Sequence, residues 1–264
     1  MAARVETRIE QRDGGAVAVV SVCNAAKLNI LGSTTTRMLT AALGGLAGTP
    51  GLRAVVLRGE GERAFIGGAD INEMAVLDAA RARQFITTLH QACAAIRALP
   101  VPVIARMQGY ALGAGLEIAA ACDLRVASVG AKMGMPEVRV GIPSVIEAAL
   151  LPMLIGWGRT RRLLLTGETI DAPTALAWGL VEEVAAEDAL DQAIDRLLGD
   201  MLACGPNALR QQKALLAQWE ELTPKAAIEA GIGCFAASWA SSEPAERMAA
   251  FLAGRRKRQA GLRR

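Results

Sequence analysis

One acidic residue, Glu117, interrupts an otherwise apolar stretch of the chain, residues 111–121 (ALGAGLEIAAA). Burying an isolated carboxylate costs several kcal/mol or forces the group to take up a proton, so a buried glutamate needs a partner or a task. A buried ion pair or a hydrogen-bonded structural acid would meet that need. The functional alternative is a carboxyl group with a raised pKa that faces a cavity and transfers protons.

Two glycine-rich segments could present backbone N–H groups to an anion or to a polarised carbonyl oxygen. In the first, residues 64–71 (AFIGGADI), the glycines let the backbone adopt positive φ and come close to a ligand. The second, residues 108–117 (QGYALGAGLE), leads into the apolar helix, whose first N–H groups lack intrahelical partners and carry the positive end of the dipole. An ordinary tight turn that ends at an N-capping Asp70 would also explain the first segment.

A second acidic residue, Glu137, follows a predicted strand and a proline in residues 132–137 (KMGMPE). This pattern predicts that Glu137 lies in a loop. Loop glutamates are usually only solvated, so Glu137 indicates catalysis only in combination with the two glycine-rich segments.

Strands and helices alternate along the part of the chain that carries these residues. The sequence predicts, in order, a hairpin (4–10 and 16–22), a helix capped by Ser33 or Thr34 and running to about Ala47, a strand (53–58), a helix (78–99) and a strand (101–107). This order favours right-handed crossovers around a largely parallel sheet. From about Trp157 the chain is mostly helical. We therefore expect an α/β core over residues 1–200 and a smaller helical region over residues 201–264.

Composition argues against several classes of site. A single histidine, His90, leaves almost no material for a multi-histidine metal site or a Ser-His-Asp triad, and the five cysteines show no CxxC or metal-type spacing. The chain starts without an apolar signal region, and no apolar stretch is long enough to span a membrane, so we expect a soluble, cytoplasmic protein. The tail, residues 254–264, holds six basic and no acidic residues, and removing those six charges turns the net +3 into −3. We therefore expect no nucleic-acid partner.

Taken in this order and spacing, the two glycine-rich segments and the Pro136-Glu137 pair resemble the enoyl-CoA hydratase/isomerase family, also called crotonases. The resemblance covers essentially the whole chain and includes residues 158–184 (GRTRRLLLTGETIDAPTALAWGLVEEV). It implies an α/β fold, a crotonase-like spiral of ββα units, followed by a helical C-terminal trimerisation region. It also implies assembly as a homotrimer or a dimer of trimers.

The resemblance further implies an acyl-CoA substrate. Relatives hold the thioester oxygen between two backbone N–H groups, which match Ala69 and Ala114 here, and their two carboxylates match Glu117 and Glu137. Substrate contacts are expected at the remaining matching positions, which are Lys27, Leu28, Gly68, Asp70, Ile71 and Gly113. For Lys27, in the loop AAKLN, a contact with a coenzyme A phosphate and a merely solvated side chain are both open. No metal or redox cofactor is required, because amide donors and carboxyls can perform the proton chemistry.

Three functions remain open. Hydration of an enoyl-CoA double bond needs two acids and is favoured by the presence of both Glu117 and Glu137, whereas double-bond isomerisation in this family often needs one. An RNA-binding or scaffold role would rest on the basic tail, which a solvated chain end explains more simply. The sequence departs from the family pattern at two places near the expected site. Residues 144–149 (SVIEAA) replace a glycine-rich stretch of familiar hydratases, and Ala114 replaces a glycine that many relatives have. The preferred acyl group therefore does not follow from the resemblance.

Overall fold

The predicted N-terminal hairpin forms one edge of the larger of two sheets. A computed structural model describes residues 3–261, with side chains over residues 3–255. β1 (Arg4–Arg12) and β2 (Gly15–Cys23) pair antiparallel. Four parallel strands continue the sheet in the order β1-β2-β3-β5-β7-β10, namely β3 (Leu52–Gly59), β5 (Val103–Met107), β7 (Leu124–Ser128) and β10 (Glu183–Ala185). The predicted hairpin and the largely parallel sheet are confirmed.

A second sheet contains four strands of three residues each. Its order is β4 (Ala64–Ile66), β6 (Tyr110–Leu112), β8 (Lys132–Gly134) and β9 (Thr169–Asp171). β3, β5 and β7 of the large sheet are each followed by a strand of the small sheet and then by helical structure. The chain thus winds as a spiral of ββα units, as expected. The turns of this spiral bring segments that are far apart in the sequence next to one another.

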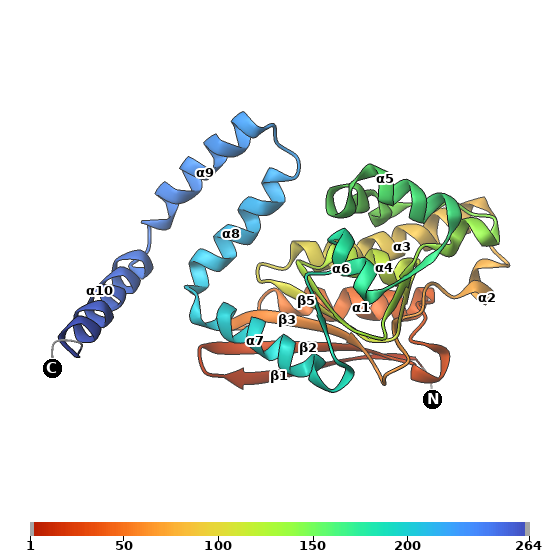
Figure 1. Cartoon of the computed structure of the whole chain (residues 1–264). Coiled ribbons are helices and arrows are strands. Elements are labelled where there is room, and N and C mark those ends of the chain that lie inside the picture. The colour runs from red at the N-terminus through yellow and green to blue at the C-terminus, as the bar shows by residue number, and fades with distance from the viewer. Residues whose placement is uncertain (1–2, 262–264) are drawn as a thin grey trace. The chain divides into compact units, whose positions relative to one another are not determined.

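Helices lie against the large sheet (Figure 1). α1 (Ser33–Leu46) packs against α3 (Ala79–Ala98), and α3 packs against α4 (Ala114–Ala121). All eight residues of α4 are buried, as its apolar sequence predicts. The other helices of this part are α2 (Ile71–Met74), α5 (Leu151–Thr166), α6 (Ala172–Trp178) and α7 (Leu190–Ala203), with 3-10 helices η1 (Ala25–Lys27), η2 (Pro136–Val140), η3 (Ile146–Leu150) and η4 (Glu187–Ala189).

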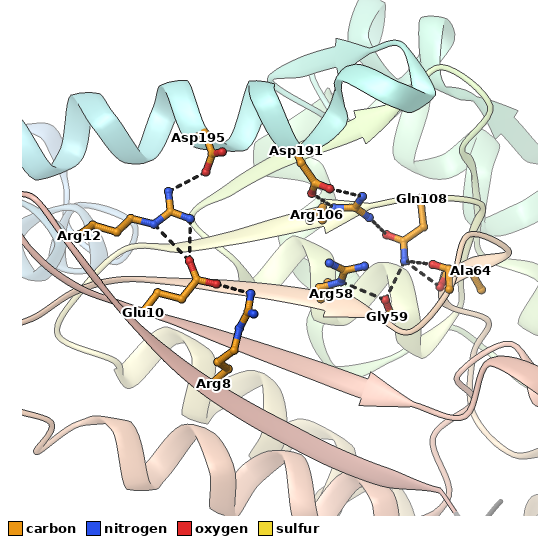
Figure 2. A network of polar contacts seen from close by, with 11 residues as sticks. Arg8, Glu10, Arg12, Arg58, Gly59, Ala64, Arg106, Gln108, Asp191 and Asp195 are labelled. Carbon is orange, nitrogen blue, oxygen red and sulfur yellow. Dashed lines mark hydrogen bonds and ion pairs between the residues drawn. The ribbon is translucent and has the colours of Figure 1, made fainter.

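Ion pairs attach α7 to the face of the large sheet opposite the main core (Figure 2). Ala105 and Met107 of β5 belong to that core, and Arg106 between them contacts Asp191 of α7 at 2.5 Å. Side chains alternate across a strand, so Arg106 points away from the core. Arg12 makes a second link, at 2.6 Å, to Asp195 one turn further along α7.

Two buried amide side chains stabilise the point where the chain leaves the large sheet for the small one. The amide nitrogen of Gln108 donates to the carbonyls of Gly59 and Gly61, both at 2.9 Å. The amide nitrogen of Asn29 donates to the Ala64 carbonyl, also at 2.9 Å. Both side chains are fully buried, and each donates to main-chain carbonyls at this crossing. They therefore fix the start of β4, which leads directly into the first glycine-rich segment.

Helix ends show which local predictions hold. Asp78 caps α3 by accepting from the Arg81 amide at 2.8 Å, in agreement with the predicted start of that helix. The predicted caps of α1 are wrong, because its N-cap is Gly32 and the amide of Ser33 donates instead to the Glu73 carboxylate at 2.8 Å. The predicted loop around Glu137 is also wrong: this residue lies in η2, which begins at Pro136.

The chain divides into two compact units, Met1–Gly199 and Asp200–Arg264. In the second unit, α8 (Pro206–Trp219), α9 (Pro224–Ser238) and α10 (Glu243–Gly261) follow one another. The Glu243 carboxylate accepts from the Asn207 and Ala208 amides, both at 3.0 Å, and so satisfies the free N–H groups at the start of α8. The side chains of the basic tail from residue 256 onward lie outside the described residues.

Candidate active site

An apolar pocket of about 230 Å³ opens in the first unit beside the small sheet. Its walls come from the turn after β4, from α2 and α3, from the start of α4, and from η2 and the segment that follows it. Among the described residues that line the pocket, Glu117 and Glu137 are the two with ionisable side chains. The two candidate acids, twenty positions apart in sequence, thus meet in one largely apolar space.

Glu117 lies in the first turn of α4 and is 4% exposed. Burial, the negative charge of Glu137 and that of Glu147 raise its pKa to about 8, while backbone amides of Val145 and Ala148 oppose the rise. The Ala148 amide donates to the Glu117 Oε1 at 3.3 Å. A carboxyl with this pKa is mostly protonated at neutral pH and has a proton that it can donate.

Glu137 reaches the pocket from η2, and two neighbours fix its carboxylate. The Ser144 hydroxyl donates to the Glu137 Oε2 at 2.9 Å. On the other side lies Gly113, where a Cβ would come within 2.4 Å of the Glu137 Oε1. Gly113 also has φ +52° and ψ −121°, a conformation that side chains disfavour. The backbone conformation therefore favours glycine here, and a side chain at this position would displace the Glu137 carboxylate.

Two backbone amides, those of Ala69 and Ala114, lie at the pocket wall. Leu31 holds the first segment by donating to the Gly68 carbonyl at 2.8 Å and accepting from the Asp70 amide at 3.0 Å. The amide of Ala69 between them, and that of Ala114 at the start of α4, make no hydrogen bond within the described part of the chain. Both amides are therefore free to donate to an oxygen in the pocket.

A glycine brings the two segments together. A Cβ at Gly115 would lie 2.0 Å from the Ile66 carbonyl oxygen, so the first turn of α4 packs directly on the end of β4. Only a residue without a side chain allows this approach. The contact places the amide of Ala114 near the turn that carries Ala69.

The remaining predicted substrate residues fall into two groups. Gly68, Gly113 and the half-exposed Ile71 line the apolar pocket. Lys27 and Asp70 instead line a separate polar hollow of about 310 Å³. Asp70 also accepts from the Asn72 amide at 2.9 Å, the capping role that its segment predicted.

Leu28 contributes through its backbone. It has φ +56°, and its carbonyl accepts from the Gly67 amide at 2.8 Å, which anchors the first glycine-rich turn. Leu28 lines neither the apolar pocket nor the polar hollow. The structure thus assigns it a contact with the turn rather than with the pocket.

Two polar residues near the site were not predicted from the sequence. Ser144 contacts the Glu137 carboxylate, as described above, and nothing in its local sequence indicates this. Glu147 is 6% exposed and lies 2.8 Å from the Nδ1 of His90, measured from its Oε1. The signal for Glu147 was the same as for Glu117, an acidic residue within an apolar stretch, here VIEAALL.

Comparison with known proteins assigns the chain to a family. Residues 12–260 match the family described as enoyl-CoA hydratase/isomerase. The chain belongs to the enoyl-CoA hydratase/isomerase family. It is 31% identical to a short-chain-enoyl-CoA hydratase of Clostridium acetobutylicum, with 92% of this chain and 93% of the relative covered. It is 32% identical to a crotonyl-CoA hydratase of Syntrophomonas wolfei, over 91% of this chain and 93% of the relative.

Solved structures of the enoyl-CoA hydratase/isomerase family show the same fold. The enoyl-CoA hydratase from Bacillus anthracis superposes with a TM-score of 0.90 at 27% identity, covering 95% of this chain and 96% of that one. The enoyl-CoA hydratase from Mycobacterium smegmatis gives 0.89 at 29% identity, covering 94% and 96%. The described residues of this family member include no helix long and apolar enough to cross a membrane.

Proposed function

We propose that the chain is an enoyl-CoA hydratase, which adds water across the α,β double bond of an acyl-CoA thioester. The observation that carries the proposal is that Glu117, Glu137 and the free amides of Ala69 and Ala114 line one apolar pocket. An acid, a base and two donors for a developing oxyanion are the groups that this addition needs.

The amides act on the thioester oxygen. Attack of water on the β carbon moves negative charge onto that oxygen, and the enolate-like state is stabilised by donors already pointing at it. Each such donor contributes about 3 kcal/mol to the transition state. The donors at Ala69 and Ala114 belong to the backbone, so their direction is set by the Gly68 turn and by the packing of Gly115 on β4.

The two carboxyls act as a coupled pair that holds one proton. Because Glu117 has a pKa of about 8, raised in part by the charge of Glu137, the pair keeps a proton at neutral pH. The ionised member takes a proton from the water that attacks the β carbon, and the protonated member gives its own proton to the α carbon. A water between them lets the pair return to its starting state after each turnover.

The pocket favours a short, uncharged acyl group. Its volume of about 230 Å³ is below the roughly 300–1,000 Å³ of pockets that hold drug-sized ligands, which supports a small acyl group. Its other walls are apolar or backbone, and the ionised carboxylate of the pair repels an acyl group that ends in a carboxylate. We therefore expect a crotonyl group to be a better substrate than one of equal length with a terminal carboxylate.

The test measures loss of the conjugated thioester absorbance of crotonyl-CoA. We expect hydration by the wild type, and a fall in turnover of about 10²-fold or more for Glu117→Gln and for Glu137→Gln, which keep size but lose proton transfer. Glu62→Gln, in an exposed loop, is the control and should turn over normally. Turnover of a 3-enoyl-CoA together with normal activity of Glu137→Gln would instead identify a one-acid isomerase.

Assembly and cofactor use belong to the same proposal. Ile228, Ile232 and Phe235 of α9 recur at helical spacing and are 67%, 60% and 68% exposed in the single chain. Such an exposed apolar stripe supports an interface in which these side chains are buried between copies of the chain. We therefore propose a homotrimer or a dimer of trimers, and light scattering on the purified protein checks this.

No metal takes part in the proposed steps, so turnover should survive dialysis against EDTA.

A further inference from the structure

A third carboxyl, that of Glu147, lies behind the pair in the pocket. Glu147 belongs to η3, is 6% exposed and is not part of the pocket wall. Its Oε1 contacts the Nδ1 of His90 on α3 at 2.8 Å, and the His90 side chain is 54% exposed. The Glu147 Oε2 is buried and has no hydrogen-bond partner in the described residues. Burying a carboxyl with a hydrogen bond to only one of its two oxygens costs free energy, and the proposed hydration mechanism does not use Glu147.

The titratable groups around Glu147 come from two helices. α3 contributes His90 and Cys93, and burial followed by the Glu147 charge raises the pKa of the Cys93 thiol well above its usual range. α4 contributes Glu117, on whose pKa the Glu147 charge also acts upward. Glu137 acts on Glu117 from the other side, in η2. His90 is thus the group in this set that can bring positive charge to Glu147.

η3 connects Glu147 to Glu117 by geometry as well as by charge. The amide of Ala148, the residue after Glu147, donates to the Glu117 Oε1 at 3.3 Å. The same short helix therefore fixes the position of the Glu117 carboxyl and holds a second carboxyl close to it. In a water-poor interior such a neighbour favours the neutral form of Glu117.

We propose that Glu147 and His90 form a positioning couple for Glu117, in which the Glu147 charge keeps the proton on Glu117 and His90 moderates that charge from the solvent side. This inference rests on the proposed hydratase function for its catalytic meaning, but the coupling itself does not. Glu147 touches no substrate in this scheme. It acts through Glu117.

The experiment measures the titration of Glu117 directly, by infrared spectroscopy of protein labelled with ¹³C-glutamate. The Glu117 band is the one missing in Glu117→Gln. In Glu147→Gln we expect the midpoint of that band to fall from about 8 by roughly one pH unit. The limb of the pH–rate profile on which activity falls as Glu117 loses its proton should move to lower pH by a similar amount. Glu62→Gln, which removes an exposed carboxyl, should leave both midpoints in place.

His90→Gln gives the opposite sign. Glutamine can still donate to Glu147 but cannot carry positive charge, so the Glu117 midpoint should rise. In the double variant His90→Gln/Glu147→Gln, the histidine change should add nothing to the glutamate change. Because His90 is half exposed, its variant tests the couple even when Glu147→Gln folds poorly.

Two results would overturn the couple: an unchanged Glu117 midpoint in folded Glu147→Gln, or a midpoint in His90→Gln that does not rise. The infrared midpoint does not depend on turnover. If the Glu117 midpoint shifts in a protein that hydrates no enoyl-CoA, the coupling is supported and the proposed hydratase function is refuted. If the protein hydrates enoyl-CoA but the midpoint does not shift, the hydratase function stands and the coupling is refuted.

Discussion

Replacement of Gly113 by alanine should separate the geometry of the pocket from its chemistry, because no titratable group changes. The new Cβ would lie 2.4 Å from the Glu137 Oε1, whereas ordinary contacts begin near 3.4 Å. The Glu137 carboxylate must therefore retreat by about 1 Å. The backbone at φ +52° and ψ −121° adds strain of about 1–3 kcal/mol for a residue with a side chain.

These displacements predict a loss in kcat of about 10²-fold, since a catalytic group misplaced by about 1 Å commonly costs that much. The change also disturbs the amide of Ala114, which follows directly. KM should change less than kcat, because the acyl pocket keeps its apolar walls. The assay is initial-rate hydration of crotonyl-CoA over a range of substrate concentrations, together with chemical denaturation of the same preparations.

Gly44→Ala is the matched control. Gly44 lies in α1, where a Cβ would find nothing within 4 Å, so alanine should stabilise the protein by about 0.5–1 kcal/mol and leave kcat unchanged. A folded Gly113→Ala protein with wild-type kcat would refute the placement of Glu137 against Gly113, and with it the geometry of the proposed acid–base pair.

Three further predictions test the amides, the buried acid and the attachment of α7. Ala69→Pro removes an N–H donor and should lower kcat by about 10²-fold, whereas Ala69→Gly keeps the donor and should stay within about tenfold; equal rates for the two would place the thioester oxygen elsewhere. The pKa of Glu117 rises from 4.5 to about 8 on folding, so the folded state binds more protons between these values and stability falls as pH rises through them. Denaturation at a series of pH values should show Glu117→Gln gaining stability relative to wild type over that window, and parallel curves would contradict the raised pKa. Asp191→Ala, which leaves the 4%-exposed Arg106 without its carboxylate, should cost about 2 kcal/mol. Asp195→Ala, at an exposed pair, should cost less than about 1 kcal/mol, and equal losses would argue against a special role for the buried arginine.

Local sequence was sufficient for elements whose boundaries are set by their own residues. α3 spans Ala79–Ala98 with Asp78 as its N-cap, close to the predicted range of residues 78–99. In the small sheet the strand before Pro136 was predicted, but the other three were not, because strands of three residues are too short to show an alternating pattern. The predicted cap of α1 was wrong because the group that accepts from the Ser33 amide is the carboxylate of Glu73, forty positions away along the chain. A local pattern cannot reveal such a distant partner.

Within the site, the sequence by itself determined that Glu117 is buried, because an apolar helix carries it inward whatever packs around it. It also indicated that free amides and positive φ would occur in the two glycine-rich segments, because glycines and a helix start are local features, whereas the positive φ of Leu28 has no such local signal. Tertiary structure decided the rest. The position of Glu137 against Gly113, and the contact of His90 with Glu147, join residues 24 and 57 positions apart. Such contacts depend on how successive ββα turns stack, and no periodicity within one element encodes that stacking.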